Sequence, residues 1–243
     1  MEETLDLLGK LCKEYFDSGK SNELKLQLDN GIIMDDFPVS FYVDTKELRE
    51  LEKKFLKKAK GRILDVGCGS GRIGLILKEG GLEAIGIDIS DNMVYIAQKR
   101  GLTAYKMDIN KELPKGIFDT VIMYGNGFGM PGSIENIQNF LRRLHSITSS
   151  DAIIIAESND PNRMTNRIDL EYQERNKKLG RYTGQRKWRY ISGNKVGIYQ
   201  DWVQVEPNLL KKIAKETDWK ITDDPEYEKE SRWGAYFFTL SKG

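Results

Sequence analysis

The stretch Ile63-Leu-Asp-Val-Gly-Cys-Gly-Ser-Gly-Arg72 is the most informative part of this 243-residue chain. Its first residues are apolar except for Asp65, which is typical of a buried strand, and a helical pattern begins straight after the last glycine. Gly67, Gly69 and Gly71 permit a tight turn and let a ligand approach the backbone closely. The stretch therefore predicts a strand, a ligand-binding glycine loop and a helix.

Aspartates at the ends of the predicted strands suit a ligand that contains adenosine. Asp88 ends the next strand, 21 residues after Gly67, where a carboxylate can accept hydrogen bonds from both ribose hydroxyls. Asp108 ends the third strand, where it can accept a hydrogen bond from an exocyclic adenine amine. Asp65 lies inside the first strand, and a charge buried there needs loop amides or a cation as partners.

These motifs resemble those of class I S-adenosylmethionine-dependent methyltransferases. The matching stretches are 63–71, 85–89, 107–109 and 118–123, and the similarity covers residues 60–160. The resemblance implies S-adenosylmethionine as cofactor and S-adenosylhomocysteine as product. It places the three glycines at the methionine part, Asp65 near the ammonium and Asp88 at the ribose. Met107, Asp108 and Ile109 would frame the adenine, and the loop 124–129 would lie beside the methyl sulfonium.

The predicted cofactor-binding set follows from these motifs and their flanking residues. It comprises Tyr42, Asp65, Gly67, Cys68, Gly69, Gly71, Asp88, Ile89, Met93, Met107, Asp108, Ile109, Tyr124, Gly125 and Asn126.

A nicotinamide dinucleotide enzyme is the main alternative. Its fingerprint has the third glycine three residues after the second, whereas Gly71 follows Gly69 by two. Arg72 at the start of the helix does not exclude a pyrophosphate. A carboxylate at Asp108 nevertheless suits an adenosine without a diphosphate better, so the sequence favours S-adenosylmethionine.

Composition argues against several classes of protein. The chain has 38 Lys and Arg against 37 Asp and Glu, and a net charge of +1 is low for a general nucleic-acid binder. Two cysteines cannot form a disulfide framework or a four-ligand zinc site, and we predict no metal. No apolar run reaches the length of a membrane span, and the N-terminus does not resemble a signal peptide. We therefore expect a cytoplasmic protein with no membrane partner.

Strands and helices alternate in the middle of the chain. Strands are predicted at 63–66, 84–87, 103–107, 120–124 and 152–156, and helices at 72–78, 92–99 and 134–147. This alternation predicts an α/β fold with a Rossmann-like, doubly wound and mostly parallel sheet. Later elements are a hairpin of 182–192 with 195–205, a helix at 207–217, and strands at 219–222 and 235–240. We expect the last strand to pair antiparallel at the sheet edge.

We divide the chain into a core with two additions. The predicted segments are an N-terminal helical lid at 1–60, the S-adenosylmethionine-binding core at 61–160, an inserted substrate cap at 161–205 after the fifth core strand, and a C-terminal helix and strands at 206–243. Within the lid, 35–42 is expected to be extended or looped. A second lid helix is predicted near Asp44, with Glu47 completing a capping box.

We predict a small-molecule methyl acceptor, methylated on nitrogen or oxygen. Residues 162–195 contain ten basic and three acidic side chains, a net charge of +7, interleaved with aromatics. Such a segment suits an anionic or zwitterionic acceptor, although a solvated basic surface would look the same. The candidates for catalysis are Tyr124, Glu157, Tyr172 and Arg175, and Tyr42 and Asn126 are further candidates for acceptor contact. An RNA or peptide methyltransferase and a non-catalytic S-adenosylmethionine-binding module stay open as alternatives, and the sequence leaves the oligomeric state undetermined.

Overall fold

The structure is a computed structural model that describes residues 2–35, 38–229 and 231–243. The chain forms two compact units, each assembled from separate stretches of sequence. The first unit comprises Met1–Glu47, Gly67–Asp108 and Lys187–Gln200. The second comprises Leu48–Val66, Ile109–Arg186 and Asp201–Gly243.

The first unit contains a β-α-β element that follows the glycine loop. Helix α4 (Arg72–Glu79) is followed by β5 (Glu83–Asp88), α5 (Asp91–Lys99) and β6 (Thr103–Lys106). Strands β5 and β6 pair in parallel. Ser90 caps α5, because its hydroxyl oxygen accepts a hydrogen bond from the Met93 N–H at 3.1 Å. The predicted strands and helices of this region are confirmed to within a residue or two.

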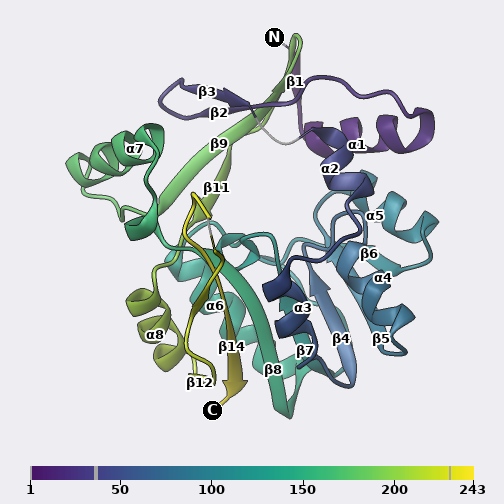
Figure 1. The fold of residues 1–243 in the computed structure, drawn as a ribbon. Helices are drawn as coiled ribbons and strands as arrows, with labels where there is room; N and C mark the ends of the chain where they lie inside the picture. Colours follow the sequence, from purple (N-terminus) through teal and green to yellow (C-terminus); the bar gives the residue numbers. More distant parts are fainter. Residues whose placement is uncertain (1, 36–37, 230) are drawn as a thin grey trace. The chain divides into compact units, whose positions relative to one another are not determined.

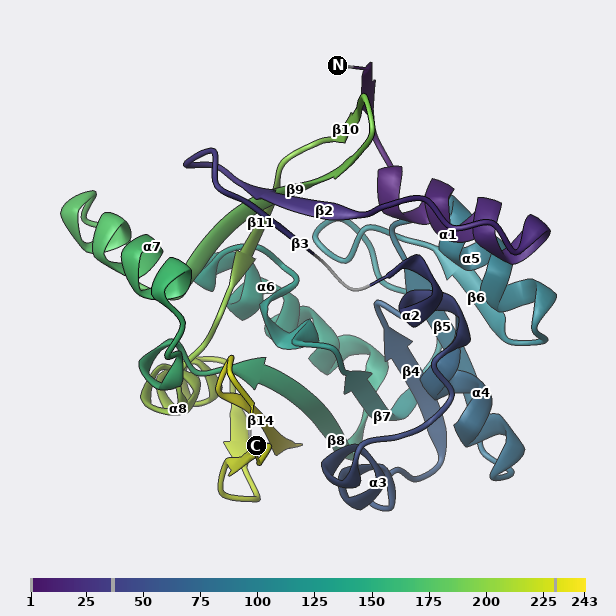
Figure 2. The same ribbon diagram turned by 45° about the horizontal axis from the view of Figure 1, so that its top comes forward.

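The first unit also contains a small sheet that the sequence did not predict in full. Its strand order is β1-β10-β9-β2-β3, which joins N-terminal strands to a hairpin from late in the chain. The strands are β1 (Glu2–Thr4), β2 (Lys25–Leu28), β3 (Ile33–Asp35), β9 (Gln185–Ser192) and β10 (Lys195–Gly197). Figure 2 shows β2 beside β9, and α1 (Leu7–Ser18) beside α5.

This sheet confirms one expectation and corrects another. The β9–β10 hairpin turns at residues 193–194, where Gly193 has a φ of +57°, as predicted. The N-terminal segment contains helices, as predicted, but also three short strands, which were not predicted. Strands of three or four residues carry almost no periodicity, and β2 is stabilised by pairing with β9, far along the sequence.

The second lid helix begins later than predicted. A short helix α2 (Val39–Asp44) follows Pro38, whose fixed φ suits a helix start. Helix α3 (Glu50–Leu56) begins after Arg49, and the Glu52 carboxylate accepts from the Arg49 N–H at 2.8 Å. A helix starting at Asp44 was therefore wrong, since Asp44 ends α2. Of the stretch 35–42, positions 36 and 37 lie outside the described residues, and 39–42 are helical.

The second unit contains six strands of the larger sheet. They are β4 (Arg62–Val66), β7 (Phe118–Met123), β8 (Thr148–Asn159), β12 (Trp219–Ile221), β13 (Glu226–Tyr227) and β14 (Ala235–Lys242). Strand β7 pairs in parallel with β4 and β8, whereas β14 pairs antiparallel with β8 and with the edge strand β12. Figure 1 shows β8 between β7 and β14. The predicted antiparallel last strand is confirmed.

The remaining elements are helices and one short strand. They are α6 (Ile134–Leu144), α7 (Arg167–Lys178), α8 (Pro207–Glu216), β11 (Gln200–Val203) and the 3₁₀ turns Gly127–Gly129, His145–Ile147 and Pro161–Arg163. None of the helices described is long and apolar enough to cross a membrane.

The observed elements make a mixed α/β fold with a mostly parallel, Rossmann-like sheet, as predicted. The domain boundaries at 60, 160 and 205 remain a prediction. The compact units group residues 187–200 with the N-terminal segment, because β9 and β10 pair with its strands.

Candidate cofactor-binding site

The glycine loop before α4 depends on backbone conformations that favour glycine. Gly67, Gly69 and Gly71 have φ values of +69°, +53° and +89°. The N–H groups of Gly67 and Cys68 donate to the Ile87 carbonyl at 2.8 and 3.0 Å. The three positions identified in the sequence are therefore those at which the loop requires glycine.

The glycines meet different surroundings. A Cβ at Gly69 would have no heavy atom within 4 Å, so this part of the backbone faces open space. A Cβ at Gly71 would lie 3.2 Å from the Ala97 Cβ, so Gly71 serves packing against α5. Sequence reasoning missed Gly86 in β5, where a Cβ would lie 2.7 Å from the Cys68 Sγ. A glycine inside a predicted strand is the sequence signal that could have indicated this close approach of the glycine loop to β5.

The carboxylate of Asp88 is held by two backbone N–H groups. Gly69 donates to its Oδ2 and Ser90 to its Oδ1, both at 2.9 Å. Burial raises the pKa of Asp88, against the lowering effect of these two hydrogen bonds, and the nearby Asp6 raises it further. Each carboxylate oxygen keeps a further lone pair. The arrangement can accept two hydroxyl donors from a ligand.

Other predicted residues of the first unit lie around these two features. The Met107 N–H donates to the Asp88 carbonyl at 2.8 Å, and both Met107 and Asp108 are half-buried. Ile89 is 66% exposed. The Tyr42 carbonyl accepts from the Ser70 hydroxyl at 2.8 Å, which brings α2 to the glycine loop. Met93 is buried in an apolar cluster formed by α1, α2 and α5.

The remaining predicted residues belong to the second unit. Asp65 and Ile109 are buried there, at 3% and 7% exposure. The structure joins two of the others directly, because the Gly125 N–H donates to Glu157 Oε2 at 2.9 Å. Tyr124 is buried, and its hydroxyl donates to the Glu52 carbonyl at 3.2 Å.

Arg49 is the centre of an ionic network that sequence reasoning missed. Its guanidinium donates to both oxygens of Glu157, at 3.1 and 2.7 Å, and to Glu52 at 3.1 Å. Glu228 lies 3.5 Å from the same group. Glu52 and Glu157 are buried, whereas the Arg49 side chain is 40% exposed. No sequence pattern predicts this network, because 108 residues separate Arg49 from Glu157.

The network affects the ionisation of its members. Burial lowers the pKa of Arg49, but Glu157 and Glu52 outweigh it, so the pKa is raised. Burial raises the pKa of Glu228, Arg49 lowers it, and the carboxylates of Glu157 and Glu52 raise it again.

Among the residues the structure describes, no group of three or more His, Cys, Asp or Glu side chains is arranged to hold a metal ion. Glu157 thus serves as an ion-pair partner, with both oxygens engaged.

Asn126 anchors the loop that follows β7. It has a φ of +60°, a left-handed conformation that Asn adopts more readily than most residues. Its side-chain oxygen accepts from the Asn159 N–H at 3.1 Å, and its carbonyl accepts from the Trp202 Nε1 at 3.1 Å. The loop predicted to lie beside the sulfonium is therefore fixed by hydrogen bonds from two later segments, from the backbone of Asn159 and from the side chain of Trp202.

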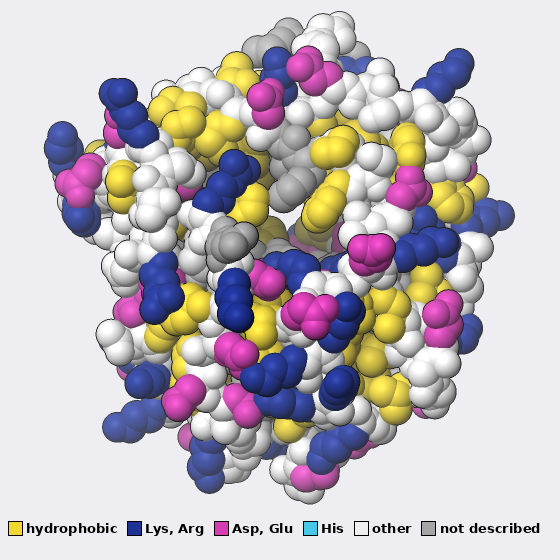
Figure 3. All heavy atoms as spheres, viewed as in Figure 1, with side chains coloured by type: hydrophobic (Ala, Val, Ile, Leu, Met, Phe, Trp, Pro, Cys, Tyr) yellow, Lys and Arg dark blue, Asp and Glu magenta, His cyan; other side chains and the backbone are white. Residues whose placement is uncertain are grey.

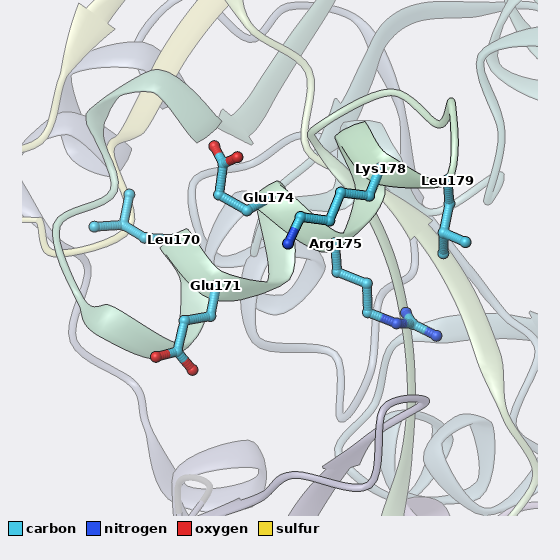
Figure 4. Close-up of a pocket in the computed structure, with 6 residues that line it drawn as sticks. All are labelled: Leu170, Glu171, Glu174, Arg175, Lys178 and Leu179. Atoms are coloured by element: carbon cyan, nitrogen blue, oxygen red, sulfur yellow. The ribbon is translucent and has the colours of Figure 1, made fainter.

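Tyr172 and Arg175 lie on α7. Tyr172 is 1% exposed, with the guanidinium carbons of Arg186 and Arg175 at 4.8 and 5.6 Å from its ring centre. A depression of about 690 Å³ lies along this helix, and Figure 4 shows the six residues that line it, Leu170, Glu171, Glu174, Arg175, Lys178 and Leu179. All six belong to α7 or directly follow it, and the depression is open to solvent.

Comparison with known proteins agrees with the glycine loop and the fold. The family described as "Methyltransferase domain" matches residues 63–151. A solved S-adenosylmethionine-dependent methyltransferase from Bacteroides fragilis, in complex with S-adenosyl-L-homocysteine, is 26% identical. The likeness covers 98% of this chain and 95% of that one, with a TM-score of 0.81. CalS10 from Micromonospora echinaspora, an amino pentose methyltransferase, shares the fold at 14% identity, covering 79% and 86% of the chains, with a TM-score of 0.53.

Curated relatives match over shorter regions. A methyltransferase of Geobacillus sp. (strain WCH70) is 23% identical over 109 residues, which is 42% of this chain and 44% of the relative. YqeM of Bacillus subtilis (strain 168) is 51% identical over 41 residues, 17% of each chain. The matched regions thus span less than half of either relative. The chain thus carries a methyltransferase domain at residues 63–151, and its motifs and fold resemble those of the class I S-adenosylmethionine-dependent methyltransferases.

Proposed function

We propose that this protein transfers the methyl group of S-adenosylmethionine to a small-molecule acceptor. The observation that carries the proposal is the Asp88 carboxylate, held between the N–H groups of Gly69 and Ser90. A carboxylate fixed in this way suits the two hydroxyls of a ribose. The open space at Gly69 leaves room for the methionine part of the cofactor next to the bare backbone.

Neighbouring residues of the first unit suit the adenine. We propose that Asp108 accepts a hydrogen bond from the adenine amine, and that Ile89 and Met107 pack against the ring. A side chain as apolar as Ile89 that is 66% exposed gains from being covered by a flat ligand. The roles of Asp65, Ile109, Tyr124, Gly125 and Asn126 stay predictions from the family resemblance.

The chemistry needs little from the protein beyond positioning. When bound, S-adenosylmethionine supplies a methyl group activated by its sulfonium. The glycine loop and Asp88 would hold the cofactor, and the protein would align the acceptor's lone pair with the methyl group while excluding water. An acceptor nitrogen or oxygen loses its proton to solvent or to a nearby base. We propose that Glu157 positions the Gly125 loop rather than taking this proton, since Arg49 engages both its oxygens.

The surface charges favour a small acceptor over RNA. On α7, Arg167 pairs with Glu171 and Lys177 with Glu174, so part of the basic segment is neutralised by its own helix. Figure 3 shows Lys and Arg interspersed with Asp and Glu over the visible face. A nucleic-acid surface would gather basic side chains in one patch. Arg175 remains our candidate for contact with an anionic or zwitterionic acceptor, whereas Tyr172 is 1% exposed and would support Arg175 from beneath.

Ligand binding tests the cofactor assignment, and labelled methyl transfer tests the acceptor class. S-adenosylhomocysteine should raise the melting temperature, because it binds only the folded protein, whereas NAD should not. The protein is then incubated with methyl-labelled S-adenosylmethionine in three separate reactions, which contain small metabolites, cellular RNA or peptides. We expect label in the metabolite fraction. Label confined to RNA or peptides would contradict the small-molecule proposal. Binding without label in any fraction would indicate a non-catalytic module.

A further inference from the structure

One carboxylate, Asp6, contacts the first turns of two helices in the first unit. Asp6 caps α1 and accepts a hydrogen bond from the Gly9 N–H at 3.1 Å. It also accepts from the Ser90 hydroxyl at 2.6 Å and the Asn92 side-chain amide at 2.9 Å. Because Ser90 caps α5 and Asn92 lies in its first turn, Asp6 connects α1 to the start of α5, which Figure 2 shows side by side.

Gly9 makes this close approach possible. A Cβ at position 9 would lie 2.1 Å from the Ser90 hydroxyl oxygen and 2.5 Å from both carboxylate oxygens of Asp6. Even an alanine would therefore displace the Ser90 hydroxyl or the Asp6 carboxylate from its hydrogen bonds. Glycine in a helix costs about 1 kcal/mol relative to alanine, so the packing at Ser90 is the physical reason for a glycine here.

Ser90 links this contact to the ribose-binding carboxylate. Its N–H donates to Asp88 Oδ1 at 2.9 Å, while its hydroxyl donates to Asp6 and accepts from the Met93 N–H. A hydroxyl has a single hydrogen, so the bond to Asp6 leaves the oxygen lone pairs available to Met93. Asp6 thus helps to fix the residue that itself holds Asp88.

The apolar contacts of α1 are separate from this polar one. Leu7, Leu11 and Cys12 of α1 pack with Met93 and Ile96 of α5 in a buried cluster. This cluster should keep α1 folded against the unit when Asp6 is changed. A substitution at Asp6 therefore tests its polar contacts rather than the presence of the helix.

The charges around Asp88 come from three elements. From α1, Asp6 faces it as a carboxylate and Cys12 as a thiol whose pKa is raised to about 12 by burial, Asp6 and Asp88. From α5 and β6, Asp91 and Lys106 pair with each other at exposed positions. Removing the charge of Asp6 should therefore lower the pKa of Asp88.

We propose that Asp6 is a positioning residue for Asp88, so that the docking of α1 and the binding of the cofactor's ribose favour each other. The inference rests on the proposed function, in which Asp88 binds the ribose. Asp6 acts through Ser90, whose backbone N–H orients the Asp88 carboxylate. Reciprocal coupling follows, because a ligand that is bound better with α1 docked also stabilises the docked state.

Calorimetry with S-adenosylhomocysteine tests the proposal in wild type, Asp6→Asn, Gly9→Ala and Asp17→Asn. Asp17 is the matched control, since it lies on the same helix and pairs with Lys13 at the surface. We expect about tenfold weaker binding in Asp6→Asn and Gly9→Ala, the effect of losing one charge-assisted hydrogen bond, and unchanged binding in Asp17→Asn. The acid midpoint of binding should also move to lower pH in Asp6→Asn, because the neighbouring charge that raises the pKa of Asp88 is lost.

Alkylation of Cys12, read by peptide mass spectrometry, reports the docking of α1 directly. S-adenosylhomocysteine should slow this alkylation in the wild type, and Gly9→Ala, which keeps the Asp6 charge that raises the thiol pKa, should be alkylated faster and protected less. Wild-type affinity together with an unchanged acid midpoint in a folded Asp6→Asn protein would overturn the proposal. Absence of S-adenosylhomocysteine binding by the wild type would instead contradict the proposed function, and this inference with it.

Discussion

The backbone N–H of Gly69 donates a hydrogen bond of 2.9 Å to the carboxylate of Asp88. This contact joins the glycine loop to the end of the next strand in the sequence, the two motifs from which the cofactor was predicted. Because Ser90 holds the other oxygen, the carboxylate is oriented before any ligand binds. Such preorganisation reduces the entropy lost when the cofactor is bound.

Replacement of Asp88 by alanine should weaken S-adenosylhomocysteine binding by about 1.5–3 kcal/mol, because two ribose hydroxyls lose a charged acceptor. Isothermal titration calorimetry measures the effect. Asp91→Ala serves as the control, since Asp91 is a neighbouring carboxylate whose partner is the exposed Lys106. Equal affinities of a folded Asp88→Ala protein and the wild type would remove Asp88 from the site.

The raised pKa of Asp88 predicts a pH dependence of cofactor binding. The ionised form accepts the ribose hydroxyls, so affinity should fall with decreasing pH, beginning at a higher pH than for an exposed aspartate. The stability of the folded state depends on pH in the opposite direction. The folded state holds the proton more tightly, so ionised Asp88 detracts from stability above its folded pKa, and this penalty disappears as the pH falls through that value.

Calorimetry across a pH series, with melting temperatures at each pH, measures both effects. A constant affinity over the pH range in which the protein stays folded would contradict this role of Asp88.

Gly69→Ala and Gly71→Ala should separate binding from packing. Both introduce a Cβ at positive φ, which costs about 1–2 kcal/mol of stability. Gly71→Ala should lose about 1–3 kcal/mol more, because its Cβ approaches Ala97 at 3.2 Å. Gly69→Ala should instead weaken S-adenosylhomocysteine binding more than tenfold, since its Cβ would occupy the open space proposed for the cofactor. Urea denaturation and calorimetry distinguish the two, and normal binding by Gly69→Ala would contradict the assignment.

Arg49→Gln should destabilise the protein by about 3 kcal/mol, because the buried carboxylates of Glu52 and Glu157 lose their cation. This value is at the low end for such pairs, since the Arg49 side chain is 40% exposed. The deficit should shrink as the pH falls, because Glu228, whose pKa burial raises, becomes protonated and no longer repels the other two carboxylates. Arg49→Lys should lose less stability, as it retains the charge. Urea unfolding at two pH values tests this, and a pH-independent deficit would contradict it.

The local part of the fold could be predicted from the sequence. Gly67, Gly69 and Gly71 have positive φ values, which few other residues tolerate, so their spacing predicted a tight loop. The parallel strands and their helices followed from apolar periodicity, and the β9–β10 turn from Gly193. Asp88 was identified because its distance from the loop is set by one helix and one turn.

Contacts between residues far apart in the sequence could not be predicted. β2 has a partner because β9 lies beside it, and Glu157 is an ion-pair partner because Arg49 approaches it from α3. The roles of Gly9 and Asp6 depend on the contact of α1 with Ser90, which is distant in the sequence. The sequence by itself determined the glycine loop, the parallel α/β core and the position of the Asp88 carboxylate at a strand end, since backbone conformation and periodicity are local properties. Only the tertiary structure decided which charges meet, because that depends on how distant segments pack.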